Sequence, residues 1–190
     1  MFVALLPPPE AVEDLAEFLA PRQEAGRDLR WTDPEQWHVT TAFLPDVADR
    51  HLDELEERLA RAAARRTPFP VAIAGSGAFP DPVRARVLFA GVRTEGVELE
   101  RLATGSRAAA TRAGARPEGG RFHAHVTLAR VRHPIEATRW LRVLDGYRGP
   151  TWTADELALV ESHLGEGPRR RPRYELRGTY PVGRQRGHGA

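Results

Sequence analysis

The sequence lacks cysteine, and it also lacks lysine. Without cysteine the chain has no disulfide, no thiolate zinc site and no thiol nucleophile, so its chemistry must use His, Thr, Ser, Arg or carboxylate groups. Without lysine, all 28 basic residues are arginines, and 26 acidic residues bring the net charge to +2. This bias is typical of a GC-rich genome. The charge alone therefore does not indicate a nucleic-acid partner, although arginine suits phosphate.

Long hydrophobic runs are also missing. No apolar stretch approaches the roughly 20 residues that a transmembrane helix needs. The opening stretch MFVALLPPPE has no basic leader and soon turns to proline, which is not the pattern of a secretory signal. We therefore expect a cytoplasmic protein with no membrane partner.

The apolar residues alternate between a period of two and a period of three to four, which is typical of strands and helices mixed in one domain. A length of 190 residues suits a single α+β domain. We expect one helix after the prolines at 7–9 and others at about 49–66, 95–113 and 135–146. The expected strands are 2–6, 29–31, 37–44, 68–75, 84–93, 121–131, 156–164 and 173–182, with a turn at 76–82 between hairpin partners.

Each half of the chain carries one His-x-Thr on an expected strand, in HVTTAFL at 38–44 and in RFHAHVTLAR at 121–130. This repeat indicates a duplication with pseudo-twofold symmetry. We expect two lobes, each an antiparallel-rich sheet with two helices, and a catalytic cleft between the sheets. The bilobal domain is expected to span 1–182, followed by a disordered tail at 183–190.

Residues i and i+2 of a strand point to the same face of the sheet. His38 therefore shares a face with Thr40, and His125 shares a face with Thr127 and with His123. If both strands face one cleft, two imidazoles and two hydroxyls converge there. These side chains are the candidate functional residues.

Two imidazoles suit acid–base chemistry near neutral pH, because one can be neutral while the other is protonated. The neutral ring can take a proton from an attacking water, and the charged ring can donate one to a leaving oxygen. Threonine hydroxyls can donate to a bound anion, so the set fits a phosphodiester. The residues at i+4, Ala42 and Ala129, are small, and we expect them to leave room for a ligand on the same face.

Other interpretations of these residues remain open. A short motif can arise by chance, and a lone histidine on a strand is more often structural than catalytic. His123 and His125 could ligate a metal with His38, but no carboxylate accompanies them at ligand spacing, so we expect neither metal nor cofactor. The arginine run at 169–173 is either a solvated loop or a clamp on a nucleic-acid backbone.

Several stretches together resemble the 2H phosphoesterases, and within them the RNA 2′,3′-cyclic phosphodiesterases, also called 2′-5′ RNA ligases. The resemblance covers nearly the whole chain. It begins with FVALLPP at 2–8, continues through WHVTTAFL and FHAHVTLAR, and ends with LVESHL at 159–164 and RYEL at 173–176. The paired His-x-Thr motifs are typical of the superfamily, and the form FH-x-H-x-TL-x-R is more specific to this branch.

The resemblance implies a metal-independent enzyme that hydrolyses terminal 2′,3′-cyclic phosphates of RNA to 2′-phosphates, with a possible reverse 2′-5′ ligation. It implies that His38 and His125 are the catalytic pair and that Thr40 and Thr127 bind phosphate oxygens. Arg130 matches an arginine of the family pattern. Strand parity places Arg130 opposite to His125, so its approach to phosphate requires a bulge or the end of the strand. His123 is expected to tune its neighbour or to touch the substrate.

The sequence departs from the family pattern at three positions. Thr41 stands where leucine is usual, and a hydroxyl buried there without a partner costs about 1 kcal/mol or more. Pro45 replaces a glycine, and Ala124 replaces a frequent proline. None of these positions carries an expected functional side chain. They bear on local stability and loop shape instead.

The expected partner is RNA, or a nucleotide, with a cyclic phosphate end, bound by a monomer. Two other functions stay open at this point. A related phosphodiesterase could prefer a small nucleotide, such as a cyclic phosphate or a 2′-5′ oligoadenylate. A non-catalytic protein could instead bind RNA ends through the arginines at 169–173. The sequence does not decide which histidine is the acid and which is the base.

Overall fold

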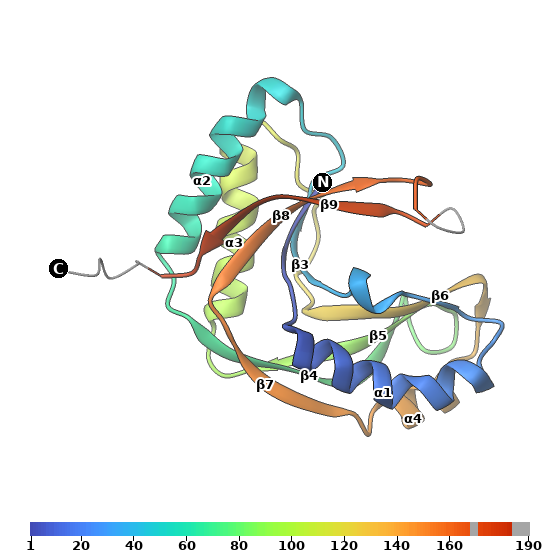
Figure 1. The fold of residues 1–190 in the computed structure, drawn as a ribbon. Helices are drawn as coiled ribbons and strands as arrows, with labels where there is room; N and C mark the ends of the chain where they lie inside the picture. The colour runs from blue at the N-terminus through green and yellow to red at the C-terminus, as the bar shows by residue number, and fades with distance from the viewer. Residues whose placement is uncertain (168–170, 184–190) are drawn as a thin grey trace.

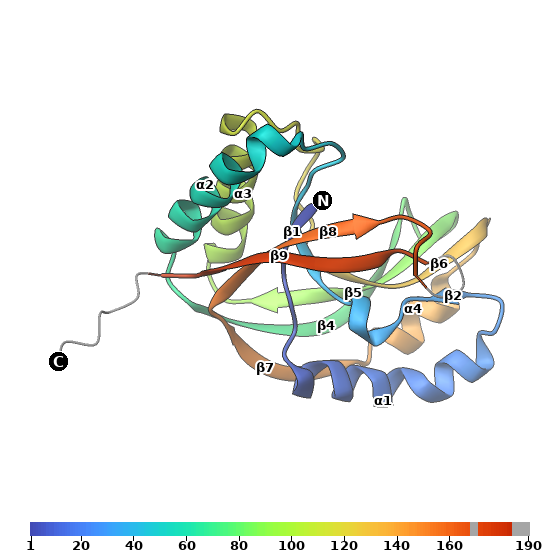
Figure 2. The ribbon, with the colours of Figure 1, turned by 45° about the horizontal axis from the view of Figure 1, so that its top comes forward.

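The structure is a computed structural model that describes residues 1–167 and 171–183. These residues form two antiparallel sheets and four α-helices. Figures 1 and 2 show the sheets as two layers, with a pair of helices on the outer side of each. The expected tail at 183–190 lies, apart from Gly183, outside the described residues. No helix in the described ranges is long and apolar enough to cross a membrane.

The first sheet has the strand order β3-β1-β8-β9. Its strands are β1 (Phe2–Leu5), β3 (Val39–Phe43), β8 (Glu156–His163) and β9 (Arg173–Pro181). Strand β1 pairs with both β3 and β8, so the two ends of the chain meet at the centre of this sheet. Helices α2 (Leu52–Ala64) and α3 (Glu98–Arg112) pack together and against this sheet.

The second sheet has the strand order β2-β6-β5-β4-β7. Its strands are β2 (Arg30–Trp31), β4 (Phe69–Phe79), β5 (Ala85–Thr94), β6 (His125–Ile135) and β7 (Arg148–Ala154). Helix α1 (Pro9–Ala25) packs on β7 and α4 (Thr138–Leu144) packs on β4. Short 3-10 helices at Pro34–Gln36 (η1) and Asp49–His51 (η2) precede β3 and α2.

The expected α+β class with two antiparallel sheets is confirmed, but the lobes do not coincide with the halves of the sequence. The first lobe takes β1, β3 and α2 from the N-terminal half and α3, β8 and β9 from the C-terminal half. Helix α1 lies on the other lobe, beside α4 (Figure 1). The interleaving follows from β1, because it pairs with strands from both ends of the chain.

Three expected elements differ in extent. The hairpin of β4 and β5 is present, but β4 continues through Phe79, so most of the expected turn at 76–82 is strand. Strand β6 begins at His125 and continues to Ile135, which leaves only Thr138–Leu144 for the expected helix at 135–146. Long pairing with β5 holds the chain extended over these residues, since Ile135 pairs with Ala85.

Strand β7 has no counterpart among the expected elements. It contains Gly149 and Pro150, which are depleted in strands, and most of its residues are exposed. It is the edge strand of the second sheet and pairs only with β4. A strand of this kind shows little apolar alternation, so its sequence does not predict it.

The two faces of β1 show where the core and the open space lie. Val3 and Leu5 are buried in the large hydrophobic core, which fills the space between the sheets and the helices. Phe2 and Ala4 point the other way, into a smaller apolar cluster against which Tyr174 of β9 packs. The first sheet therefore has one face in the core and the other beneath a cleft.

Candidate active site

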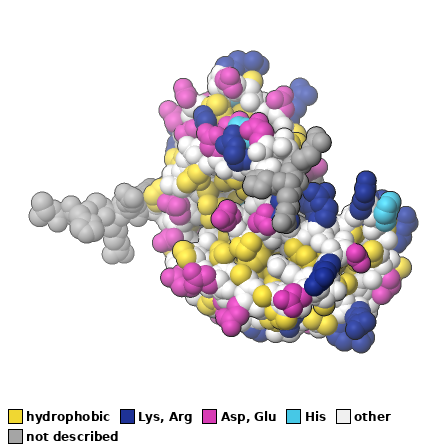
Figure 3. Space-filling view, turned by 45° about the vertical axis from the view of Figure 1, so that its right-hand side comes forward, with side chains coloured by type: hydrophobic (Ala, Val, Ile, Leu, Met, Phe, Trp, Pro, Cys, Tyr) yellow, Lys and Arg dark blue, Asp and Glu magenta, His cyan; other side chains and the backbone are white. Residues whose placement is uncertain are grey.

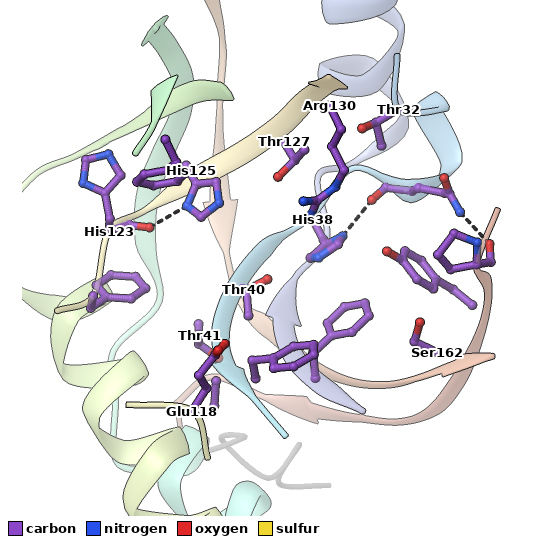
Figure 4. A pocket seen from close by; sticks show the side chains of 18 of the residues that line it. Thr32, His38, Thr40, Thr41, Glu118, His123, His125, Thr127, Arg130 and Ser162 are labelled. Carbon is purple, nitrogen blue, oxygen red and sulfur yellow. Dashed lines mark hydrogen bonds between the residues drawn. The ribbon is translucent and has the colours of Figure 1, made fainter. Parts of the chain in front are cut away.

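A cleft of about 690 Å³ opens between the two sheets and brings the two His-x-Thr motifs together. His38 and Thr40 reach it from β3 and the residue before it, and His125 and Thr127 reach it from β6. Figure 4 shows these four side chains and Arg130 around one space. Figure 3 shows the notch between the lobes from outside, with arginines beside it. His123 also lines the cleft, so all six expected site residues share it.

Both motif strands contain a β-bulge at the same position of the motif. On β3, the residues on either side of Thr41 pair with consecutive residues of β1, so Thr41 is an extra residue. On β6, the residues on either side of Leu128 pair with consecutive residues of β5, so Leu128 is also extra. Thr41 and Leu128 each stand three residues after the motif histidine. A bulge reverses the alternation of side chains beyond it.

The bulges decide which later residues face the cleft. Beyond them the residues at i+5 line it: Phe43 is 44% exposed, and Arg130 is exposed as well. The alanines at i+4, Ala42 and Ala129, are buried at 1% and 0% exposure. Ala129 does not line the cleft, so the expectation is wrong for this residue, whereas Ala42 does line the cleft although it is almost fully buried. Arg130 shares the cleft with His125 because the bulge that its approach requires is present.

The hydroxyl of Thr41 is buried but has partners. Thr41 Oγ1 lies 3.1 Å from the carbonyl oxygen of Val3 and 3.3 Å from Ser106 Oγ, and either atom can accept its proton. Ser106 in turn donates to the carbonyl of Leu102 in α3. The usual leucine is thus replaced by a hydroxyl pair that links the bulge of β3 to α3. The cost expected of an unpartnered hydroxyl does not arise.

Each catalytic candidate is oriented by the backbone two residues before it. His38 Nδ1 lies 2.7 Å from the carbonyl oxygen of Gln36, and His125 Nδ1 lies 2.8 Å from that of His123. A carbonyl oxygen only accepts, so both Nδ1 atoms carry a proton and donate it. In the neutral state Nε2 of each ring is then an acceptor. The same device in both strands prepares both rings for proton transfer.

Aromatic rings hold each imidazole. His38 stacks on Phe2 with ring centres 4.3 Å apart and meets the edge of Tyr174 at 5.6 Å. On the other side, His125 packs against Phe79 at 5.0 Å and Phe89 at 5.2 Å. These contacts desolvate the two rings and limit their rotation.

His123 lies beside His125, with ring centres 6.1 Å apart, and packs against the same two phenylalanines. A charge on His123 would lower the pKa of His125. This arrangement fits the expected tuning role of His123. Within the described ranges, no group of three His, Asp or Glu side chains is arranged to hold a metal ion.

The two imidazoles differ in their pKa. Burial, helped by the nearby His125 and Arg130 and opposed by the hydrogen bond to the Gln36 carbonyl, lowers the pKa of His38 to about 4. Burial also lowers the pKa of His125, with His123 and Arg130 acting in the same direction. Both rings are therefore neutral at pH 7 in the free protein. His38, the more deeply desolvated ring, resists protonation more strongly.

Sequence reasoning missed most of the cleft's positive charge. Arg30, Arg107 and Arg121 line the cleft in addition to Arg130 and to Arg171 of the arginine run. Arg30 and Arg130 are direct cross-strand partners on β2 and β6. Two like charges facing each other destabilise a sheet, and none of the ion pairs among the described residues involves Arg30 or Arg130. An anion in the cleft would remove this repulsion. Only the pairing of β2 with β6 reveals that Arg30 and Arg130 face each other.

For the arginine run at 169–173, the ion pairs of its described members favour the solvated loop over the clamp on a nucleic-acid backbone. Arg169 and Arg170 lie outside the described residues. Arg171 forms an ion pair with Asp33, and Arg173 forms ion pairs with two glutamates at 2.9 and 3.3 Å. The described members of the run are therefore largely neutralised by carboxylates.

Comparison with known proteins places this fold and cleft in a family. The family model described as LigT like Phosphoesterase matches residues 5–89 and 92–169. The chain therefore belongs to the LigT-like phosphoesterases, and the resemblance drawn from the sequence is confirmed at the level of the family.

Several relatives are named RNA 2′,3′-cyclic phosphodiesterase. The Aeropyrum pernix protein is 36% identical over 107 residues, which is 56% of this chain and 60% of the relative. The Archaeoglobus fulgidus protein is 39% identical over 104 residues, or 55% and 57%. This chain thus spans less than two thirds of either relative. The Aquifex aeolicus protein is 28% identical over 159 residues, covering 82% of this chain and 84% of the relative.

Solved structures share the whole fold. A Thermus thermophilus protein superposes with a TM-score of 0.77 at 28% identity, covering 95% of this chain and 96% of that one. Escherichia coli LigT complexed with 3′-AMP superposes with a TM-score of 0.76 at 25% identity, again covering 95% and 96%. The two-layer arrangement is therefore that of solved family structures.

Proposed function

We propose that this protein hydrolyses the terminal 2′,3′-cyclic phosphate of RNA to a 2′-phosphate, without a metal ion, through acid–base action of His38 and His125. One observation carries the proposal. Two imidazoles share one cleft, and each has its Nδ1 proton held by a backbone carbonyl so that Nε2 is available for proton transfer. Two such groups are what the hydrolysis of a phosphodiester with an alkoxide leaving group requires.

The reaction has one bond-forming and one bond-breaking event at phosphorus. A water oxygen attacks the phosphorus atom while the P–O3′ bond breaks. One imidazole accepts the proton of the water through Nε2, and the other donates the proton that O3′ needs. The product carries a 2′-phosphate and a free 3′-hydroxyl. The two imidazoles then exchange protons with solvent to restore their starting states.

We assign the base to His38 and the acid to His125. His38 is the more strongly desolvated ring, and its pKa of about 4 keeps it neutral and able to accept a proton. His125 faces the cleft more openly, and a phosphate anion bound beside it favours its charged form. This division supports a single direction of proton flow across the cleft.

The remaining side chains bind the phosphate. Thr40 and Thr127 each stand two residues after a catalytic histidine and line the same cleft, where their hydroxyls can donate to the non-bridging oxygens. Arg130 can place its guanidinium against the same oxygens and offset the charge that develops in the transition state. An anion there also relieves the repulsion between Arg30 and Arg130.

The relatives support RNA as the substrate class, because those described above are named RNA 2′,3′-cyclic phosphodiesterase. The E. coli LigT structure complexed with 3′-AMP supports a nucleotide as a ligand of this fold. The same machinery also accounts for a reverse 2′-5′ ligation. A 5′-hydroxyl of RNA that attacks in place of water, with O3′ as the leaving group, leaves a 2′-5′ linkage.

The test is an assay of the purified protein with an RNA oligonucleotide that ends in a 2′,3′-cyclic phosphate, in the presence of EDTA. We expect complete conversion to the 2′-phosphate. Absence of product with EDTA but turnover after adding a divalent metal would overturn metal independence, and absence of product in both would overturn the function. A 2′,3′-cyclic mononucleotide, assayed in parallel, distinguishes an RNA enzyme from one that prefers small nucleotides.

A further inference from the structure

A groove of about 410 Å³ runs between α2 and α3, which lie side by side in both ribbon views (Figures 1 and 2). Its floor is made of small residues: a Cβ added to Gly105 would touch the Cβ of Ala62 at 3.7 Å. Its rim carries six arginines from the two helices and the α2 C-terminus: Arg58, Arg61, Arg65, Arg66, Arg101 and Arg112. Glu100 is the single carboxylate in this lining.

Half of these arginines are paired within their own helix. Arg58 pairs with Glu54 at 2.6 Å, and Arg61 and Arg101 pair with glutamates at 3.3 and 3.0 Å. Such exposed pairs are weak and leave part of each guanidinium free to bind.

The other three, Arg65, Arg66 and Arg112, form no ion pair with any carboxylate of the described chain. Arg66 acts on Glu98 only at range, where it helps to lower the pKa of that carboxylate. The groove therefore concentrates positive charge. The whole chain carries a net charge of only +2, so this concentration is not an average property of the surface.

Helix α3 connects this groove to the cleft. Arg107 of α3 lines the cleft, and Arg112, little more than one turn further along the same helix, lines the groove. The two sites lie on different sides of α3. An elongated ligand that occupied both sites would cross the exposed face of the helix, a distance of about one helix width, 10–12 Å. Thr104 and Thr111 are exposed, and no bulky apolar side chain of α3 blocks this path.

We propose that the α2–α3 groove binds the phosphate backbone of the RNA strand whose cyclic phosphate end lies in the cleft. The inference rests on the proposed function for its substrate class. Arginine's planar fork of donors suits phosphate oxygens. The six guanidiniums form rows along two helices instead of converging on one point, which fits successive phosphates of a strand better than a single small anion. Because these contacts are with the phosphate backbone and not with bases, the groove should make the affinity depend on the length of the RNA and not on its sequence.

The test compares two triple variants with the same loss of charge. Arg65→Gln/Arg66→Gln/Arg112→Gln removes the unpaired groove arginines. Arg84→Gln/Arg86→Gln/Arg93→Gln removes three exposed arginines that line neither site. Thermal unfolding of both variants checks that they are folded. The binding probe is a fluorescein-labelled single-stranded RNA that ends in a 2′-phosphate, followed by fluorescence anisotropy over a range of salt concentrations.

The groove variant is expected to bind this RNA at least about fivefold more weakly, and its slope of log K against log salt should fall by about 2, at about 0.7 per lost contact. The control variant should keep the slope of the wild type. Hydrolysis of a 2′,3′-cyclic mononucleotide should be unchanged in both variants. Equal weakening in the two variants, or an unchanged slope in the groove variant, would overturn the groove site.

Failure of the proposed function gives a different result. In that case the wild type would not hydrolyse the cyclic mononucleotide or the RNA, whereas the anisotropy comparison would still report on the groove. Loss of mononucleotide turnover in a folded groove variant would also count against the inference, because it would show that these arginines act on the cleft itself.

Discussion

The two His-x-Thr strands share one backbone design and differ in what surrounds their imidazoles. Both have a carbonyl that holds Nδ1 and a bulge three residues after the histidine. His38 stacks on Phe2 and has its pKa lowered to about 4, whereas His125 is more open and lies beside His123. A repeated scaffold thus gives two rings the same orientation, and their neighbours give them different proton affinities.

The same comparison holds beyond the bulges. The cleft-facing residue at i+5 is Phe43 on β3 and Arg130 on β6. One strand therefore presents an apolar ring to the cleft and the other presents a charge. The difference places the charge that we propose to bind phosphate on the side of His125, where it favours an anion next to the proposed acid.

Removal of either imidazole has the largest expected effect. His38→Ala and His125→Ala should each lower kcat on cyclic-phosphate RNA by about 10²–10⁴-fold, since each removes one partner in proton transfer. Steady-state hydrolysis rates measure this effect. His133→Ala is a matched control, because His133 is exposed on β6 outside the cleft, and it should keep the wild-type rate. A wild-type rate in either cleft variant would remove that residue from the mechanism.

The second prediction concerns the charge of Arg130 on β6, which has no counterpart on β3. Arg130→Gln should lower kcat/KM by about 10–100-fold, because a hydrogen bond to a charged group contributes about 1.5–3 kcal/mol. Phe43→Leu, at the equivalent position of β3, should have a much smaller effect. Arg132→Gln changes an exposed arginine of the same strand outside the cleft and serves as the control. Similar losses in the Arg130 and Arg132 variants would contradict a specific role for Arg130.

The ring packing around His125 is tested by Gly77→Ala. A Cβ at Gly77 would overlap the ring of Phe89, so this buried ring must move. Because Phe89 packs on His125, we expect kcat/KM to fall by about tenfold with a smaller change in KM, in line with lost orientation. Unchanged kinetics in a folded variant would show that this packing does not position His125. Gly146→Ala is the control, because Gly146 does not line the cleft and its added Cβ would meet only the Val143 carbonyl oxygen, at 3.8 Å.

The smallest effect is expected at the bulge of β3. Thr41→Val keeps the shape of the side chain but removes its buried hydroxyl, and it should lower the free energy of unfolding by about 1–2 kcal/mol. Denaturant unfolding measures this change. Combining it with Ser106→Ala should cost less than the sum of the single changes, because the two hydroxyls share one interaction. Strict additivity would show that Thr41 and Ser106 are independent.

Sequence reasoning found the two motif strands because a period of two survives in any half-buried strand. His38, Thr40, His125 and Thr127 all precede the bulges, so simple alternation places them on the cleft face. Beyond the bulges at Thr41 and Leu128, simple alternation assigns the side chains to the wrong face. Whether a strand bulges depends on its pairing with β1 or β5, and neither partner is adjacent to it in the sequence.

The other misses have the same non-local origin. Strand β7 gains its structure from pairing with β4, not from its own Gly149 and Pro150. Helix α1 lies on the second lobe although β1, which precedes it, lies in the first. This arrangement follows from the central position of β1 in a sheet that joins both ends of the chain. Arg30 looks like an ordinary surface residue until β2 pairs with β6 and sets it opposite Arg130.

The pH dependence of kcat/KM on a cyclic mononucleotide tests most directly whether His38 and His125 act as base and acid with different pKa values. The base must be neutral, so the rate should rise with pH through the His38 pKa of about 4. The acid must be protonated, so the rate should fall as pH rises through the His125 pKa, which burial holds below the usual value of about 6.5. We predict a bell-shaped profile with its optimum between these limits, and His125→Ala should lose the falling limb. A flat profile, or a falling limb well above pH 6.5, would contradict the account.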